Sequence, residues 1–120
     1  MVSQVATYRE AGRQLLAQAH AELDAGDLRH ASEKGWWAAA QTVKAAAQSR
    51  GWPHNAHRDL WTGIRDLTNE VGDPDIHGLF GSAHYLHGNF YENAFDADMV
   101  ARYLDHVEQF LTKLEGILDA

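Results

Sequence analysis

Apolar residues recur three or four positions apart along most of the chain, and no stretch alternates apolar and polar residues as a strand does. The clearest series is C-terminal, where spacings of four and three alternate as in a coiled-coil seam: Val100, Leu104, Val107, Leu111, Leu114 and Leu118. Tyr103, Phe110 and Ile117 widen this seam into a broad face. One neighbouring helix does not cover such a face, so we expect burial from two sides, inside a bundle or across a dimer.

Glycine, proline and aspartate residues divide this pattern into five segments. Three of the four breaks are Gly26 with Asp27, Gly51-Trp52-Pro53 and Gly72-Asp73-Pro74; each contains a helix terminator, and Asp27 and Asp73 are N-caps for the next helix. The pattern predicts helices over residues 2–25, from an N-cap at 27 to residue 50, 55–71 and 74–91, and a last helix capped by Asp96 or Asp98. The expected fold is all-α, an up-and-down bundle of about five helices forming a single domain over residues 1–120.

Length and composition fit a small cytoplasmic domain. With 120 residues, the chain has a size at which one hydrophobic core is expected. It contains no cysteine, which excludes disulfide frameworks and thiolate metal sites. No apolar run approaches the roughly 18 residues of a membrane-spanning helix, and the first residues lack the pattern of a secretory signal. We therefore expect a cytoplasmic protein without membrane contact.

The net charge of −7 is unevenly distributed. Residues 1–65 hold eight Lys and Arg against six Asp and Glu, whereas residues 66–120 hold two against eleven. Because the second part would repel a polyanion, nucleic acid is a disfavoured partner. Arg50, Arg58 and Arg65 form a basic group in the first part, for which a solvated surface is the simpler interpretation.

Eight histidines are the unusual feature of this composition. On the helix predicted over 74–91, His87 falls in the middle of the apolar stripe and His84 lies on its flank. His57 lies on the apolar stripe of the preceding helix. A histidine that faces the interior must form a hydrogen bond or shift its pKa, so each is either a satisfied core residue or a poised acid or base.

His84 and His87 also have the spacing of half a metal site, which would need a further ligand such as His57, Glu33 or Glu92. We expect no metal, because an HxxH pair arises easily by chance among eight histidines. The chain lacks a glycine-rich phosphate loop, a GxSxG motif, a kinase signature and a cysteine nucleophile. No cofactor is therefore expected, and most enzyme classes have no support.

Four tryptophans offer planar surfaces on which nucleic-acid bases stack. Trp36 and Trp61 fall on the apolar stripes of their predicted helices, where packing is the expected role. Trp37 and Trp52 lie off those stripes, so a surface role stays open for them.

Two segments resemble signatures of a known family. Residues 21–39, AELDAGDLRHASEKGWWAA, resemble the N-terminal signature of the archaeal PaREP paralogous family. Residues 86–92, LHGNFYE, resemble its later LHxNFYE signature, and residues 57–60 between them also fit. The resemblance covers most of the chain. It implies a HEPN-like helical bundle, because this family looks like a branch of the HEPN superfamily.

The resemblance also implies a chemistry that composition and spacing do not supply. HEPN proteins commonly dimerise, and many are metal-independent ribonucleases in which an arginine shortly precedes a histidine. The histidine would exchange the proton of a ribose 2′-hydroxyl while the arginine steadies the phosphate. If His87 matches the motif histidine, Ser82 stands five positions before it, and residues 67–86 contain no arginine. Arg50 precedes His57 by a suitable gap, but the helix break at residues 51–53 separates them.

The leading hypothesis is a noncatalytic, homodimeric HEPN-like module that binds a nucleotide, a small ligand or a partner protein. The candidate ligand-binding residues are His57, His84, His87, Asn89 and Tyr91. In a regular helix Asn89 points away from His87, and only a loosened chain at Gly88 would turn it toward that histidine.

Two other hypotheses remain. The first is a metal-independent ribonuclease of the toxin or defence type, with His87 or His57 as its acid or base. The second is a tetratricopeptide-type helix pair suggested by residues 26–39, which has no second copy one repeat later.

Overall fold

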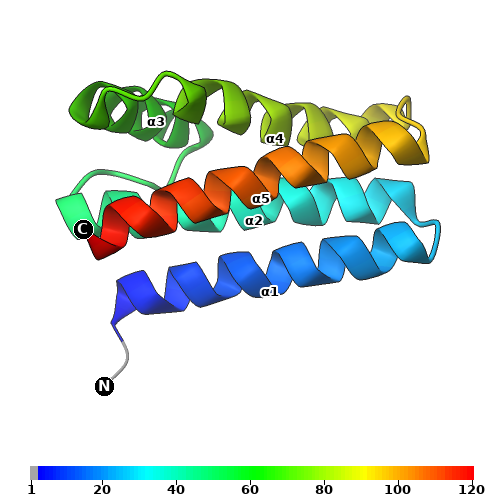
Figure 1. Cartoon of the computed structure of the whole chain (residues 1–120), viewed down its shortest axis with the longest axis horizontal. Coiled ribbons are helices and arrows are strands. Elements are labelled where there is room, and N and C mark those ends of the chain that lie inside the picture. The colour runs from blue at the N-terminus through cyan, green and yellow to red at the C-terminus, as the bar shows by residue number, and fades with distance from the viewer. Residues whose placement is uncertain (1–2) are drawn as a thin grey trace.

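A computed structural model describes residues 3–120, and over this range the chain forms five α-helices and no strand (Figure 1). The helices are α1 (Gln4–Asp24), α2 (Leu28–Arg50), α3 (His57–Val71), α4 (Asp75–Glu92) and α5 (Ala97–Asp119). The all-α prediction is confirmed, with the expected helices in the expected order. The predicted start of the first helix at Val2 lies outside the described residues.

Caps and left-handed residues place most helix ends where the sequence indicated. Asp27 accepts a hydrogen bond from His30 N at 3.2 Å, and Asp96 accepts one from Met99 N at 2.9 Å. Gly51 and Gly72 end α2 and α3 with φ values of 71° and 70°. This left-handed conformation is readily adopted by glycine and ends a helix without strain.

Two helix starts differ from the prediction. α3 begins at His57 instead of residue 55, because Asp59 Oδ2 accepts a hydrogen bond from Ala56 N at 2.9 Å and so defines the first turn. α4 begins at Asp75 instead of Pro74. Pro74 takes the N-cap position, and Asp73 Oδ1 accepts from Asp75 N at 3.1 Å.

α2 runs through the middle of the bundle and contacts each of the other four helices. Figure 1 shows α1 along one side of α2, with α3 and α4 on the other. The residues that α2 buries are mostly small: Ala31, Ser32, Gly35, Ala38, Ala39, Ala40, Ala45, Ala46 and Ala47. Among the described helices, α3 packs on α2 and α4 alone.

Side chains of both α4 and α5 pack closely on α2 at Gly35. A Cβ atom at this position would lie 2.6 Å from Leu104 Cδ2 and 2.9 Å from Leu86 Cδ1. Both distances are shorter than van der Waals contact, so a larger residue here would displace Leu86 and Leu104; the packing and not the backbone conformation favours glycine.

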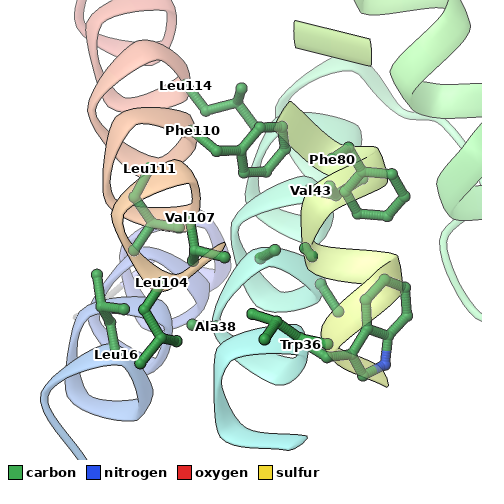
Figure 2. Packing of buried hydrophobic residues seen from close by; sticks show 14 of the residues in the cluster. Leu16, Trp36, Ala38, Val43, Phe80, Leu104, Val107, Phe110, Leu111 and Leu114 are labelled. Atoms are coloured by element: carbon green, nitrogen blue, oxygen red, sulfur yellow. The ribbon is translucent and has the colours of Figure 1, made fainter. Parts of the chain in front are cut away.

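The broad apolar face of α5 is covered within the chain. Figure 2 shows leucines and valines of α5 directed toward Leu16 of α1 and Ala38 of α2, while Phe110 approaches Phe80 of α4. The ring centroids of Phe80 and Phe110 are 5.6 Å apart, and both residues are fully buried. Because α1, α2 and α4 all pack on α5, the bundle itself accounts for the breadth of this face.

None of the described helices is both long enough and apolar enough to span a membrane.

The packing at Gly35 predicts opposite effects for one substitution at two glycines. Gly35→Ala adds a methyl group between Leu86 and Leu104, and we expect it to lower the free energy of unfolding by about 1–3 kcal/mol. Gly78→Ala, in α4, meets no atom within 4 Å, and we expect it to raise stability by about 0.5–1 kcal/mol. Urea denaturation measures both. Equal stabilisation of the two variants would contradict the close approach at Gly35.

Candidate functional site

Three histidines from two helices gather over the indole of Trp36. The ring of His57 stacks on Trp36 with centroids 5.0 Å apart and an interplanar angle of 17°. The ring of His87 stacks on the same indole at 5.0 Å and 28°, and His84 meets it edge-on at 5.9 Å. We call His57, His84 and His87, with the supporting Trp36 and Trp61, the histidine platform.

Local structure explains why these rings meet. Trp36 is the large aromatic side chain that α2 buries among small ones, and it is only 2% exposed. His57 is the first residue of α3, and His84 and His87 lie one turn apart on α4. The imidazole centroids are 5.6 Å apart for His57 and His84, 5.7 Å for His57 and His87, and 6.2 Å for His84 and His87.

Further rings extend the platform along α4 in both directions. Trp61 of α3 lies 5.5 Å from both His77 and His84, measured between ring centroids. Tyr91 lies 5.5 Å from His87 at the other end. The result is a row of rings, each within 6 Å of the next, running beside α4 from its first turn to its last.

Glu33 of α2 fixes the orientation of His87. Its Oε1 lies 3.1 Å from His87 Nδ1, and an ionised carboxylate only accepts hydrogen bonds, so Nδ1 carries the hydrogen. Whenever the ring carries a single hydrogen, Nε2 is then an acceptor. Glu33 Oε2 is buried without a hydrogen-bond partner. The sequence had suggested Glu33 only as a further metal ligand, because the contact joins residues 54 positions apart.

His87 lies at the edge of the interior, and its predicted place in the middle of the buried stripe was wrong. The buried residues of α4 are Ile76, Phe80, Ser82, Ala83, Leu86 and Asn89. Ser82 and Asn89 extend this face away from His87, because they bind partners on α5 and α2. The side chain of His87 is consequently 25% exposed. His57, predicted on an apolar stripe, is exposed, as are His84 and Tyr91.

Asn89 serves the fold instead of the platform. The regular helix turns it away from His87, as expected, and buries it to 2% exposure. Its Nδ2 donates to Ser32 Oγ at 2.9 Å, while Oδ1 accepts from Ala94 N and Phe95 N, each at 2.8 Å. These bonds tie α2 to the turn before α5. Since its polar atoms are already paired, we leave Asn89 out of the proposed ligand site.

Two of the three arginines suggested by the sequence, Arg50 and Arg65, are bound elsewhere. Arg50 pairs with Glu70 through Nε at 2.8 Å and Nη2 at 2.5 Å. Glu70 follows His57 by thirteen residues of α3, about 20 Å of helical rise, so Arg50 and His57 do not share one site. Arg65 pairs with Asp66 at 3.0 Å. Position 82, where the resemblance would place an arginine, holds a serine that lies 2.8 Å from His106 Nδ1.

One arginine that the sequence did not indicate does reach α4. Arg29 Nε donates to the carbonyl of Phe90 at 2.8 Å, and its guanidinium lies 5.2 Å from the centre of the Phe90 ring. Phe90 follows His87 by one helical turn. The hydrogen bond to a carbonyl at the C-terminal end of α4 gives Arg29 a structural role in holding α2 against that end.

Within residues 3–120, no three histidine, aspartate or glutamate side chains are arranged to share a metal ion.

One cleft borders the platform, and a larger cavity lies on another side of the bundle. A cleft of about 340 Å³ borders His84 on the outer side of α4, where Gly88, Glu92 and Phe95 also line it. A larger cavity of about 490 Å³ lies between α1 and α5, but its Arg9 and Arg13 are engaged in ion pairs with α5 acids. The platform is therefore a partly exposed surface of rings with one cleft at its edge.

The surroundings of His84 shift its titration. Partial burial of the ring, followed by the nearby His57 and His87, lowers the pKa of His84 below its ordinary value of 6.5. The unfolded chain therefore binds this proton more readily than the folded protein does. The contribution of His84 to the free energy of unfolding is therefore complete above pH 6.5, and it is lost as the pH falls through the lowered pKa.

We expect NMR titration of the imidazole signals to show His84 protonating below pH 6.5. His57→Gln and His87→Gln should each move the pKa of His84 upward, because each removes a ring whose positive charge opposes the proton. His20→Gln, on α1, serves as the control. A pKa of His84 that neither platform variant changes would contradict the contact between these rings.

The fold and the family follow from comparison with other proteins. No curated protein matches the sequence. A protein of Sulfolobus solfataricus with a known crystal structure is similar over 98% of both chains, with a TM-score of 0.75 and 20% identity, a likeness that concerns the fold. The model of the archaeal PaREP1/PaREP8 family matches residues 7–111, a range that includes the whole platform. The family resemblance is thus confirmed, and the chain belongs to the archaeal PaREP1/PaREP8 family.

Proposed function

We propose that this protein is a noncatalytic, HEPN-like helical module that binds a planar heteroaromatic ligand, such as the base of a nucleotide, on the histidine platform. The observation that carries the proposal is the gathering of His57, His84 and His87 over one buried indole with their rings still partly exposed. Such rings offer flat surfaces for stacking, and they also offer ring nitrogens for hydrogen bonds.

The platform combines a buried indole, held in place by packing, with imidazoles that remain exposed to solvent. Trp36 is buried and packs against residues of α3 and α4. The ring of Trp61 is supported by the buried Phe80, with the two ring centroids 4.7 Å apart. Stacking of a base on an aromatic side chain contributes about 1–3 kcal/mol. The cleft beside His84, at about 340 Å³, has the size of a small-ligand pocket, so part of the ligand has room beyond the stacked ring.

A noncatalytic role is supported by the positions of Arg50 and Arg65 and by the serine at position 82. A ribonuclease site needs a fixed cation near the scissile phosphate. Arg50 and Arg65 are paired with acids of α3, and Ser82 occupies the matching position on α4. The acidic second part of the chain also opposes a long polyanion.

The proposal includes a homodimer, as the sequence suggested, but with an interface other than the broad apolar face of α5. Since the bundle covers α5, a second copy would have to use side chains that remain exposed. The large apolar ones are Trp37, Val71, Tyr85, Tyr91 and Met99.

The proposal predicts that adenosine binds the protein in calorimetric titration at pH 7.5, whereas ribose does not. His57→Ala should weaken adenosine binding about 5- to 150-fold through the loss of one stacking ring. His20→Ala, on α1, should bind as the unchanged protein does. Failure of adenosine and of the other common nucleosides to bind would refute the proposal, and equal effects of the two variants would locate binding elsewhere.

A second candidate function is supported by the pairing of Glu33 with His87. A carboxylate that holds one ring nitrogen and leaves the other as an acceptor orients a general base. This arrangement would suit a metal-independent ribonuclease. Incubation with mixed RNA in the presence of a chelator distinguishes the two: intact RNA is expected, and cleavage that His87→Ala abolishes would replace the binding role with a catalytic one.

A further inference from the structure

The three imidazoles of the histidine platform face different charges. His87 is paired with the Glu33 carboxylate at 3.1 Å, so a proton taken up by His87 has a compensating negative charge beside it. No carboxylate among the described residues pairs with His57 or His84 within 4.0 Å. These two rings instead face each other, with centroids 5.6 Å apart.

The groups around these two rings are mainly uncharged or positive. From α2 they face the indole of Trp36, and from α3 His84 faces Trp61. Along α4 they face His87, and beyond it the phenol of Tyr91. Arg58 follows His57 in the first turn of α3, where Asp59 caps the amide of Ala56.

The remaining nearby acid is Glu92, on the outer side of α4. It lines the same cleft as His84, but follows His84 by eight residues, about 12 Å along the helix. It is therefore not positioned to neutralise a proton on either ring.

Two adjacent imidazoles without a counter-ion oppose each other's protonation, and an anion between them removes this opposition. We propose that His57 and His84 form an anion-binding part of the platform, which takes up about one proton when a ligand carrying a phosphate or sulfate ester binds. This inference rests on the proposed function. It assigns the ligand's ring to stacking and its anionic group to the His57–His84 pair.

The arginine of the ribonuclease motif would supply a permanent positive charge. The His57–His84 pair supplies positive charge only when its rings are protonated. An arginine stays protonated throughout the physiological range, whereas histidine with a pKa near 6.5 gains its charge only as the pH falls or as an anion arrives. The lowered pKa of His84 favours the neutral form of that ring when no anion is bound. The ligand class is accordingly a small anionic nucleotide and not a polyanion.

The test compares adenosine with adenosine 5′-sulfate, whose single negative charge does not titrate between pH 5.5 and 8. We expect the sulfate ester to bind more tightly than adenosine, by a ratio that increases at least about tenfold from pH 8 to pH 5.5, because an uptake of one proton changes the ratio about tenfold for each pH unit over which it occurs. Calorimetry at pH 6.5 in buffers of different ionisation enthalpy should show uptake of about one proton for the ester, and less for adenosine.

Variants locate the effect. His84→Gln should abolish the pH dependence of the ratio and reduce proton uptake, whatever its effect on the affinity for adenosine itself, and His20→Gln should change neither. Circular dichroism of the His84 variant confirms that it is folded, as its exposed position predicts.

The outcomes separate this inference from the function on which it rests. Adenosine binding with a pH-independent preference for the ester, or a preference that His84→Gln leaves intact, would overturn the anion site and leave the stacking site standing. Inorganic sulfate that binds as tightly as the ester, with the same proton uptake, would support the anion site and remove the stacking role. Absence of binding by all three ligands would refute both.

Discussion

Close packing on α2 is the constraint on which the rest of the structure depends. A series of small buried residues lets α4 and α5 approach α2, and at Gly35 an added Cβ atom would displace the side chains of Leu86 and Leu104. Trp36 is the large exception to this series. Because α3 packs on α2 and α4 alone, its first residue reaches this indole from one side while α4 reaches it from another. The rings therefore gather where these three helices meet.

This arrangement gives a surface whose chemistry differs from the rest of an acidic protein. Trp36 is buried beneath the platform, and the imidazoles that contact it remain partly exposed to solvent. Glu33 satisfies His87 and leaves His57 and His84 without a matching acid. His57 and His84 are therefore two groups that can gain positive charge when the pH falls or an anion binds. A surface that offers rings for stacking and a positive charge that depends on pH fits a small anionic heteroaromatic ligand better than it fits a long nucleic acid.

The sequence predicted the helices well because their signals are local. Apolar periodicity, the caps at Asp27 and Asp96 and the left-handed glycines all act within a few residues of the helix ends they determine. The start of α3 was missed because Ala56 has no capping side chain, and Asp59 reaches back to it instead. The orientation of α4 was misjudged because Ser82 and Asn89 are polar, and only their partners on α5 and α2 explain their burial. The contact between Glu33 and His87 joins distant positions that no local pattern connects.

The central claim is that ligands bind where α2, α3 and α4 meet. The most direct test is a two-dimensional NMR titration of the ¹⁵N-labelled protein with adenosine, following the imidazole and indole signals together. The account predicts that the largest changes occur at His57, His84 and the Trp61 indole, while His20 and His106 stay constant as reporters of α1 and of the cleft between α4 and α5. Changes concentrated at His20 or His106, with the platform signals unmoved, would contradict it.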